Sequence, residues 1–196
     1  IDVAFIGAPC CDRYGNINGV DGPSACGSMG YAMVDAAYAD KVIAITDHLV
    51  PHPAFPISIP QTQVDFIVVH GSIGDPAGIA SGALRISRNP RELLIAEYAA
   101  GVIEHSGYFQ EGYSLQLGSG GASLAAAQFI REKMKARGIT GSYGVGGVTA
   151  PVVDMLNEGL FSVLFDTQDF DLPSIESLRN NPRHLEMSAS YYANPN

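Results

Sequence analysis

The chain has 196 residues, of which 46% are hydrophobic and 22 are glycine, enough to build one ordinary domain or parts of two. The net charge of −9 argues against a nucleic-acid partner, because affinity for phosphate backbones depends on Lys and Arg. No apolar run approaches the roughly 18 residues of a membrane span, and the first residues lack the basic start of a signal peptide. We therefore expect no membrane partner and a cytoplasmic location.

The first half of the chain alternates strand-like and helix-like patterns. Small and apolar residues at helical spacing predict a helix over Met29–Tyr38. Four prolines in the segment 49–60 predict an irregular, extended path. Strands are predicted over Val3–Ile6, Val42–Ile45 and Phe66–Val69, and loops over 11–24 and 71–82.

The second half begins with a clear helix start, because Asn89 suits the N-cap and Pro90 the first helical position. That helix is expected to end near His105. Strands alternating with helices predict an α/β fold with mostly parallel sheets and flanking helices. We place a domain boundary near Arg88, which divides the chain into 1–88 and 89–196. Strands are predicted over Tyr113–Leu117, Gly141–Val145 and Phe161–Phe165, and helices over Ala122–Arg137, Thr149–Glu158 and Ser174–Asn180.

Two glycine turns give the clearest chemical signal. The run 118–122, Gly-Ser-Gly-Gly-Ala, stands between a predicted strand and a predicted helix, where backbone N–H groups and the helix N-terminus favour an anion. A tight turn without a ligand explains this run equally well. The second turn, Gly146-Gly147, follows the next strand. On neighbouring parallel strands both turns would lie at one sheet edge, where open α/β sheets bind ligands.

Other polar residues give weaker signals. Asp47 and His48 follow a predicted strand and could form an acid–base pair, although a lone histidine more often has a structural role. The three cysteines, Cys10, Cys11 and Cys26, lack metal-type spacing and are interpreted as reduced thiols. The histidine and cysteine spacings support no metal site, so none is predicted.

Longer strings of residues resemble a known family. Residues 8–16, with Asp12 and the Gly15-Asn16 pair, resemble a segment of CoA transferases. Residues 40–51, 61–65 and 73–82 resemble the alpha subunit of citrate lyase, and residues 118–125 and 146–149 continue the match. The resemblance covers nearly the whole chain.

The resemblance implies a CoA-transferase-like fold of two related α/β domains with the active site between them. This chain would hold the back part of the first domain and the front part of the second. The implied reaction exchanges acetyl for citryl on a carrier with a CoA-like prosthetic group, and acetyl-CoA serves as donor in the isolated reaction. The implied partners are the beta subunit and the acyl carrier subunit of citrate lyase, with citrate as the substrate.

The resemblance also implies roles for individual residues. Many CoA transferases use a glutamate nucleophile, but Gly144–Gly147 contains no glutamate. This fits direct attack of a citrate carboxylate on the thioester, with backbone N–H groups of Gly120 and Gly121 stabilising the oxyanion. Arg13 or Arg85 would meet the charge of citrate. The other residues expected to bind substrate or CoA are Gly118, Ser119, Ala122, Gly146, Gly147 and Asn16.

Three alternatives stay open. A citramalate-specific relative would carry the same motifs. A nucleotide-binding oxidoreductase would share the α/β pattern, but Ser123 replaces the third glycine of its fingerprint and Gly141 stands where an acidic residue is expected. A non-catalytic fragment that only binds partner subunits is the third alternative.

Overall fold

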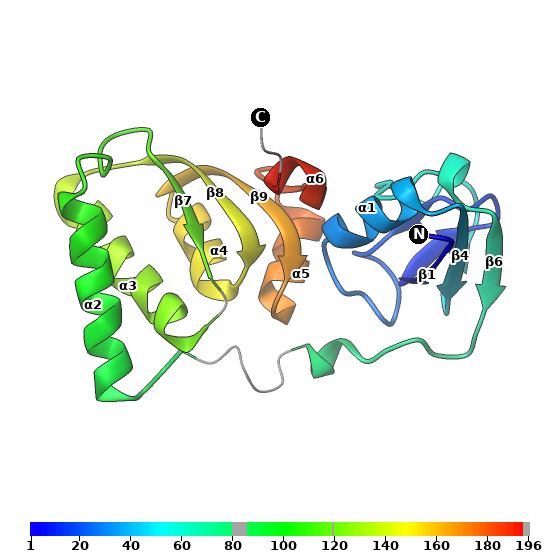
Figure 1. The fold of residues 1–196 in the computed structure, drawn as a ribbon, viewed down its shortest axis with the longest axis horizontal. Coiled ribbons are helices and arrows are strands. Elements are labelled where there is room, and N and C mark those ends of the chain that lie inside the picture. Colours follow the sequence, from blue (N-terminus) through cyan, green and yellow to red (C-terminus); the bar gives the residue numbers. More distant parts are fainter. Residues whose placement is uncertain (80–85, 119, 194–196) are drawn as a thin grey trace.

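The computed structural model describes residues 1–79, 86–118 and 120–193. Two parallel sheets with flanking helices lie side by side along the long axis (Figure 1), so the predicted α/β class is confirmed. The strands are β1 (Val3–Ala8), β2 (Cys10–Asp12), β3 (Ile17–Asn18), β4 (Lys41–Thr46), β5 (Leu49–Val50), β6 (Phe66–Val69), β7 (Ser114–Leu117), β8 (Gly141–Val148), β9 (Phe161–Asp169) and β10 (His184–Glu186). The helices are α1 (Gly30–Tyr38), α2 (Pro90–His105), α3 (Gly121–Arg137), α4 (Ala150–Asn157), α5 (Leu172–Asn180) and α6 (Ala189–Tyr192), with short 3₁₀ helices η1 (Gln61–Gln63) and η2 (Pro76–Gly78).

The first sheet has the strand order β1-β4-β6, and both pairings are parallel. Its side chains alternate between two environments, as the period of a strand requires. Ala4 and Ile6 of β1 face a core that also contains Met29 and Ile59, whereas Phe5 points outward and is exposed. A smaller sheet of order β3-β2-β5 lies in the same half of the chain.

The second sheet has the order β10-β9-β8-β7, and all its strands are parallel. Its apolar core includes Met134 of α3, Leu156 of α4, and Phe161 and Leu164 of β9. Helix α2 packs on α3 through small side chains, including Ala96. This close packing of helices on the sheet holds the carboxyl ends of the four strands in fixed positions.

Helix ends follow the sequence signals closely. The Asn89 side chain caps α2 by accepting a hydrogen bond from the backbone N–H of Arg91 at 3.0 Å, and Pro90 opens the helix. Gly138 ends α3 in the left-handed conformation, with φ of 60°. The predicted start of α2 and the predicted end of α3 are therefore confirmed.

Several predicted strand ends are wrong. Strand β8 continues through Gly146 and Gly147, which were expected to form a turn, and β9 continues to Asp169 instead of ending at Phe165. Glycine and aspartate have low strand propensity, but hydrogen bonds from parallel neighbours override that preference here. Strand β10 was not predicted, and the segments expected to be loops or irregular contain β3 and β5.

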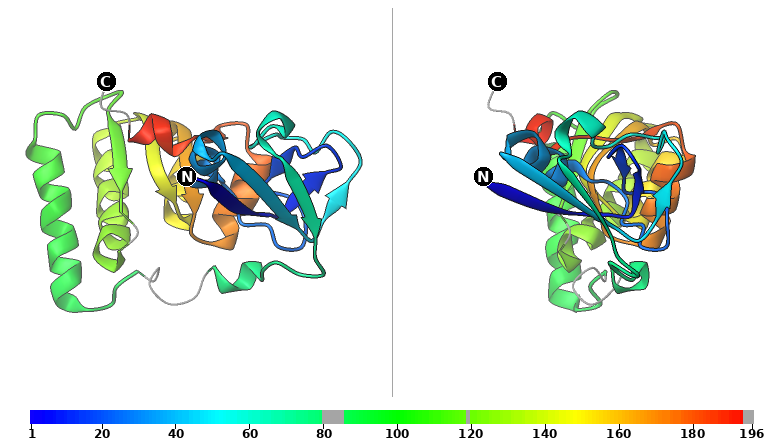
Figure 2. Two further views of the ribbon diagram at one scale, coloured as in Figure 1. Left: turned by 45° about the vertical axis from the view of Figure 1, so that its right-hand side comes forward. Right: turned by 90° about the vertical axis from the view of Figure 1, so that its right-hand side faces the viewer.

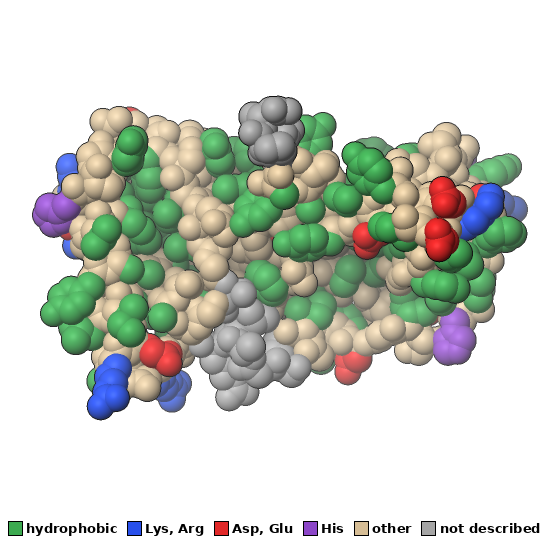
Figure 3. All heavy atoms as spheres, viewed as in Figure 1, with side chains coloured by type: hydrophobic (Ala, Val, Ile, Leu, Met, Phe, Trp, Pro, Cys, Tyr) green, Lys and Arg blue, Asp and Glu red, His purple; other side chains and the backbone are tan. Residues whose placement is uncertain are grey.

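The two halves meet along α1, which packs on β9 and on α6 (Figure 2). Apolar side chains also remain uncovered, among them Tyr98 and Val102 of α2 and Phe66 of β6. Figure 3 shows hydrophobic side chains spread over one face of both halves.

Within the described residues, no helix combines the length and the apolar character needed to cross a membrane.

Candidate functional site

The two glycine segments lie beside each other at the carboxyl end of the second sheet. Leu117, the last residue of β7, pairs with Gly146 of β8, and Gly146 pairs with Asp166 of β9. Asp166 in turn pairs with Glu186, the last residue of β10. This row of four paired residues crosses the sheet, and the glycine run that begins at Gly118 follows it directly. The structure thus brings the two segments to one sheet edge, as the sequence predicts.

Among the described residues, the first backbone donors of α3 have no hydrogen-bond partner at this edge. Its N-cap, Gly120, offers no side chain, and no side-chain hydrogen bond caps the helix. The first intrahelical bond runs from the N–H of Leu124 to the Gly120 carbonyl at 2.9 Å, so Gly121 and Ala122 precede the first intrahelical donor. A Cβ atom added to Gly120 would meet no atom of the described residues within 4 Å. Ser119 lies outside the described residues.

Local structure explains why β8 has glycine at positions 146 and 147. Gly146 has a φ of 114°, a conformation that favours glycine, and the register with β9 shifts between Gly146 and Gly147. A side chain at Gly147 would collide with the ring of Phe170. A cavity of about 710 Å³ lies over this sheet and is lined by Gln116, Tyr143, Val145, Phe165, Met187, Tyr191 and Tyr192. Another, of about 480 Å³, is lined by residues of the first half together with Arg179 of α5.

Asn16 and Arg13 are not part of this row. The Asn16 amide donates to the Asp12 carboxylate at 2.8 Å and to the Gln61 side chain at 3.1 Å, and its oxygen accepts from the Gln61 N–H. These partners belong to the first half of the chain and give Asn16 a role in fixing the loop after β2. Arg13 is exposed on the same loop, and Arg85 lies outside the described residues.

Asp12 is the centre of that loop. Its carboxylate accepts hydrogen bonds from the backbone N–H groups of Tyr14, Gly15, Asn16 and Ala54. Burial raises its pKa, but these bonds and the one from the Asn16 amide outweigh burial and hold the pKa well below its usual value. Asp12 therefore stays charged and organises the backbone around it.

The other candidates from the sequence have structural contacts. Asp47 accepts hydrogen bonds from Ser24 Oγ at 2.8 Å and from the backbone N–H of Ile73 at 3.0 Å. Burial, together with nearby aspartates, raises the pKa of Cys10 to about 11 and of Cys11 to about 12, so both thiols are protonated at neutral pH. Neither cysteine is suited to act as a nucleophile.

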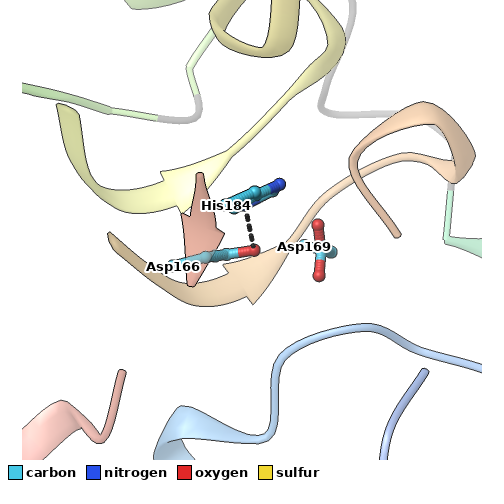
Figure 4. A group of neighbouring side chains, drawn as sticks. All are labelled: Asp166, Asp169 and His184. Atoms are coloured by element: carbon cyan, nitrogen blue, oxygen red, sulfur yellow. Dashed lines mark ion pairs between the residues drawn. The ribbon is translucent and has the colours of Figure 1, made fainter. Parts of the chain in front are cut away.

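A cluster that the sequence did not reveal lies beside the glycine edge (Figure 4). Asp166, Asp169 and His184 are 0%, 3% and 2% exposed, and His184 Nε2 lies 3.3 Å from Asp166 Oδ2. Burial raises the pKa of both carboxyl groups and lowers the pKa of the imidazole, because burial disfavours the charged form of each. The expectation of no metal site missed this cluster, since a strand ending at Phe165 leaves Asp166 outside the sheet.

Carboxylates at this end of the sheet also join the two halves of the chain. Asp169 accepts a hydrogen bond from the backbone N–H of Ser28 at 2.8 Å. Glu186 accepts one from the N–H of Met29 and another from Ser58 Oγ, both at 2.6 Å. The glycine edge and the contact between the halves are therefore parts of one region.

This arrangement of strands and helices is the fold of the CoA transferases. A 4-hydroxybutyrate CoA-transferase from Porphyromonas gingivalis shares it with a TM-score of 0.61 at 18% identity, over 97% of this chain and 46% of that one.

The particular family follows from the sequence. The model of the family "Citrate lyase, alpha subunit (CitF)" matches residues 1–196, and the chain belongs to that family. The resemblance noted in the sequence is thereby confirmed.

Two relatives show how much of a citrate lyase alpha chain this chain covers. The citrate lyase alpha chain of Klebsiella pneumoniae is 54% identical over 195 residues, which are 100% of this chain and 38% of that protein. A Streptococcus mutans structure, described as the alpha subunit of citrate lyase in complex with citrate, is 57% identical with a TM-score of 0.93 and likewise covers 100% of this chain and 38% of that one. The chain thus spans 38% of the length of each of these relatives.

Proposed function

We propose that this chain supplies part of the active site in which acetyl is exchanged for citryl on a CoA-type thiol carrier. The observation that carries the proposal is the pairing of Leu117 with Gly146, which sets the two glycine segments side by side at the ligand-binding edge of a CoA-transferase-like sheet. The citrate bound in the Streptococcus mutans relative supports citrate as the substrate.

The proposed chemistry needs no nucleophile from the glycine segments. A citrate carboxylate oxygen attacks the acetyl thioester carbon, the C–S bond breaks, and a mixed anhydride and a thiolate result. The thiolate then attacks the citryl carbonyl of the anhydride, which forms the citryl thioester and releases acetate. Each attack creates a tetrahedral oxyanion, and in this proposal the backbone N–H groups of Gly120 and Gly121 stabilise it.

The surroundings of Gly120 support a role in ligand binding. Its φ of −71° is allowed for any residue, and the space around a Cβ atom is open. Neither backbone strain nor packing within the described residues requires glycine here. Close approach of a ligand to the backbone supplies a reason, whereas Gly147 is already explained by the neighbouring Phe170 ring.

The experiment is a transfer assay on purified protein containing this chain, with acetyl-CoA and isotope-labelled citrate, and with citryl-CoA detected by mass spectrometry. Valine keeps the backbone N–H, but its branched side chain would stop the substrate from reaching the donors. Gly120→Val is therefore expected to lower the rate about 10²–10³-fold, the typical cost of losing an oxyanion-hole donor, while the melting temperature is retained. Gly71→Val is the matched control, because Gly71 also has no atom within 4 Å of a Cβ. Unchanged transfer by a folded Gly120→Val protein would exclude the proposed role.

The remaining parts of the proposal concern the molecules around this chain. We propose coenzyme A or acetyl-CoA as the donor in the isolated reaction and a CoA-like prosthetic group on the carrier subunit. The beta subunit and the acyl carrier subunit of citrate lyase are the proposed partners, in the cytoplasm. The division into 1–88 and 89–196 is proposed as the domain boundary. The same assay with labelled citramalate in place of citrate distinguishes a citrate-specific enzyme from a citramalate-specific relative.

A further inference from the structure

Four buried polar side-chain atoms make no hydrogen bond of good geometry, and they are the complete set of such atoms found among the described residues. They are Thr149 Oγ1, Asp166 Oδ2, Asp169 Oδ1 and His184 Nε2. Two of the four, Asp166 Oδ2 and His184 Nε2, lie 3.3 Å apart as an ion pair. Three of the four belong to the cluster in Figure 4, and Thr149 follows Val148, which pairs with Asp169. Buried polar atoms in native proteins are nearly always paired, so such a concentration in one place needs an explanation.

We infer that Asp166, Asp169 and His184 form a binding site for a divalent transition-metal ion, with Zn²⁺ as the ion that fits best. One ligand atom from each residue lies within 4.8 Å of the others. Zinc accepts imidazole nitrogen and carboxylate oxygen at about 2.0–2.2 Å, whereas Mg²⁺ and Ca²⁺ prefer ligand sets made of oxygen alone. The inference does not depend on the proposed transfer reaction.

Charge balance favours a doubly charged ion. Two carboxyl groups are costly to bury in the charged form when the one basic side chain beside them is a buried histidine. One divalent ion would cancel the charge of both. In the described part of the chain, no Lys or Arg forms an ion pair with Asp166 or Asp169. The neighbouring carboxylate, Glu186, already accepts bonds from Met29 and Ser58 and is left out of the set.

Surrounding hydrogen bonds hold the three ligands in place. His184 Nδ1 lies 3.0 Å from Ser177 Oγ, and a ring proton on Nδ1 leaves the Nε2 lone pair free for the ion. Asp166 Oδ1 accepts from the N–H of Gln168 at 2.8 Å, and Asp169 Oδ2 accepts from the N–H of Ser28 at 2.8 Å. In each carboxylate, a hydrogen bond to one oxygen fixes the orientation of the group, and the other oxygen is available to bind the ion.

We assign the site a structural role because its ligands are buried, all three being at most 3% exposed. Three protein ligands leave the fourth position of a tetrahedral Zn²⁺ for a water molecule. A groove of about 560 Å³, lined in part by Ser58, His184 and Glu186, gives an approach from outside. A bound ion would tie the end of β9 to β10 and, through Ser28, to the first half of the chain.

The test uses purified protein containing this chain, stripped of metal with a chelator and then titrated with Zn²⁺, Mn²⁺ or Mg²⁺. Metal content is measured by mass spectrometry after gel filtration, and the melting temperature is recorded in parallel. We expect about one Zn²⁺ for each chain, a melting temperature that rises with Zn²⁺, and no such rise with Mg²⁺. Ser177→Ala, which leaves the ligands intact, is expected to weaken Zn²⁺ binding about 10–100-fold.

Two further variants make the result specific. Asp169→Asn is expected to abolish stoichiometric Zn²⁺ binding, while Asp47→Asn, the same change at a carboxylate outside the cluster, leaves it intact. If Asp169→Asn does not fold, the inference is tested by comparing the Zn²⁺ titrations of the unchanged protein and of Ser177→Ala. The inference is overturned if the stripped protein binds no Zn²⁺ and its melting temperature does not move. It is equally overturned if Asp169→Asn or Ser177→Ala binds Zn²⁺ as tightly as the unchanged protein.

Discussion

The backbone N–H of Ser28 donates a 2.8 Å hydrogen bond to the Asp169 carboxylate, 141 positions further along the chain. The bond connects the loop before α1 with the end of β9, and the preceding residue makes the approach possible. Gly27 has a φ of 84°, and a side chain there would collide with the Asp169 carboxylate. Glycine at position 27 thus serves both the backbone conformation and the contact between the halves.

Gly27→Ala is therefore expected to destabilise the protein. The left-handed conformation alone costs a non-glycine residue about 1–2 kcal/mol, and displacement of Asp169 adds to that loss. Urea unfolding followed by circular dichroism measures the change. An alanine variant as stable as the unchanged protein would show that the close approach of Gly27 to Asp169 is not required.

Gly101 and Gly138 form a matched pair with opposite expected effects. Gly101 lies inside α2 with no atom within 4 Å of a Cβ, so Gly101→Ala should raise the free energy of unfolding by about 0.5–1 kcal/mol. Gly138 ends α3 with a positive φ, so Gly138→Ala should lower it by about 1 kcal/mol. Both are measured by urea unfolding, and equal effects of the two changes would contradict this account.

Asp12→Asn is expected to lower the free energy of unfolding by about 2 kcal/mol or more at pH 7, because backbone donors lose a charged acceptor. The folded pKa of Asp12 lies below its unfolded value, so its contribution is fully present above about pH 5 and is lost as the pH falls through the folded pKa. The difference in melting temperature between the two proteins should consequently narrow below about pH 4.

A matched control for that change is Asp75→Asn. Asp75 is an exposed cap of η2, and asparagine caps as well as aspartate, so the expected change is within about 0.5 kcal/mol. For Asp12→Asn, a melting-temperature difference from the unchanged protein that becomes larger as the pH falls would contradict the proposed role of Asp12.

Cys10 and Cys11 are expected to resist thiol reagents in the folded protein. Both are buried and their thiols titrate well above neutral pH, whereas Cys26 is partly exposed. With a disulfide reagent at pH 8, two thiols should react at least about tenfold more slowly than in the chain unfolded by denaturant. Rapid reaction of all three thiols in the folded state would contradict the burial of this pair.

Local signals explain what the sequence could predict. Strand β6 and the helix start at Asn89-Pro90 were predicted to the residue, because apolar runs and caps act within a few positions. The closeness of Gly118 and Gly146 was also predictable, because both follow neighbouring parallel strands in the expected sheet. The expected turn at Gly146-Gly147 was wrong, since both residues lie inside β8. The roles assigned to Gly120 and Gly121 stay a prediction.

Non-local contacts explain what the sequence could not predict. Strand β10 is short and pairs only with β9, and its partner fixes it more than its own residues do. Asp166 and His184 are separated in the chain by α5, so no local pattern links them. The pattern Asp-x-x-Asp at 166–169, followed by an acidic residue and a histidine further on, was the available signal. Its meaning depended on knowing that β9 extends to Asp169.

The row Leu117–Gly146–Asp166–Glu186 has a mechanical consequence. One end of the row carries the glycine edge, and the other end is held by backbone donors from the loop before α1. Directional bonds of this kind resist sliding, whereas an apolar contact could slip. A rotation of one half against the other would strain the bond from Met29 to Glu186, and in this row Glu186 is joined to Gly146 through Asp166 alone.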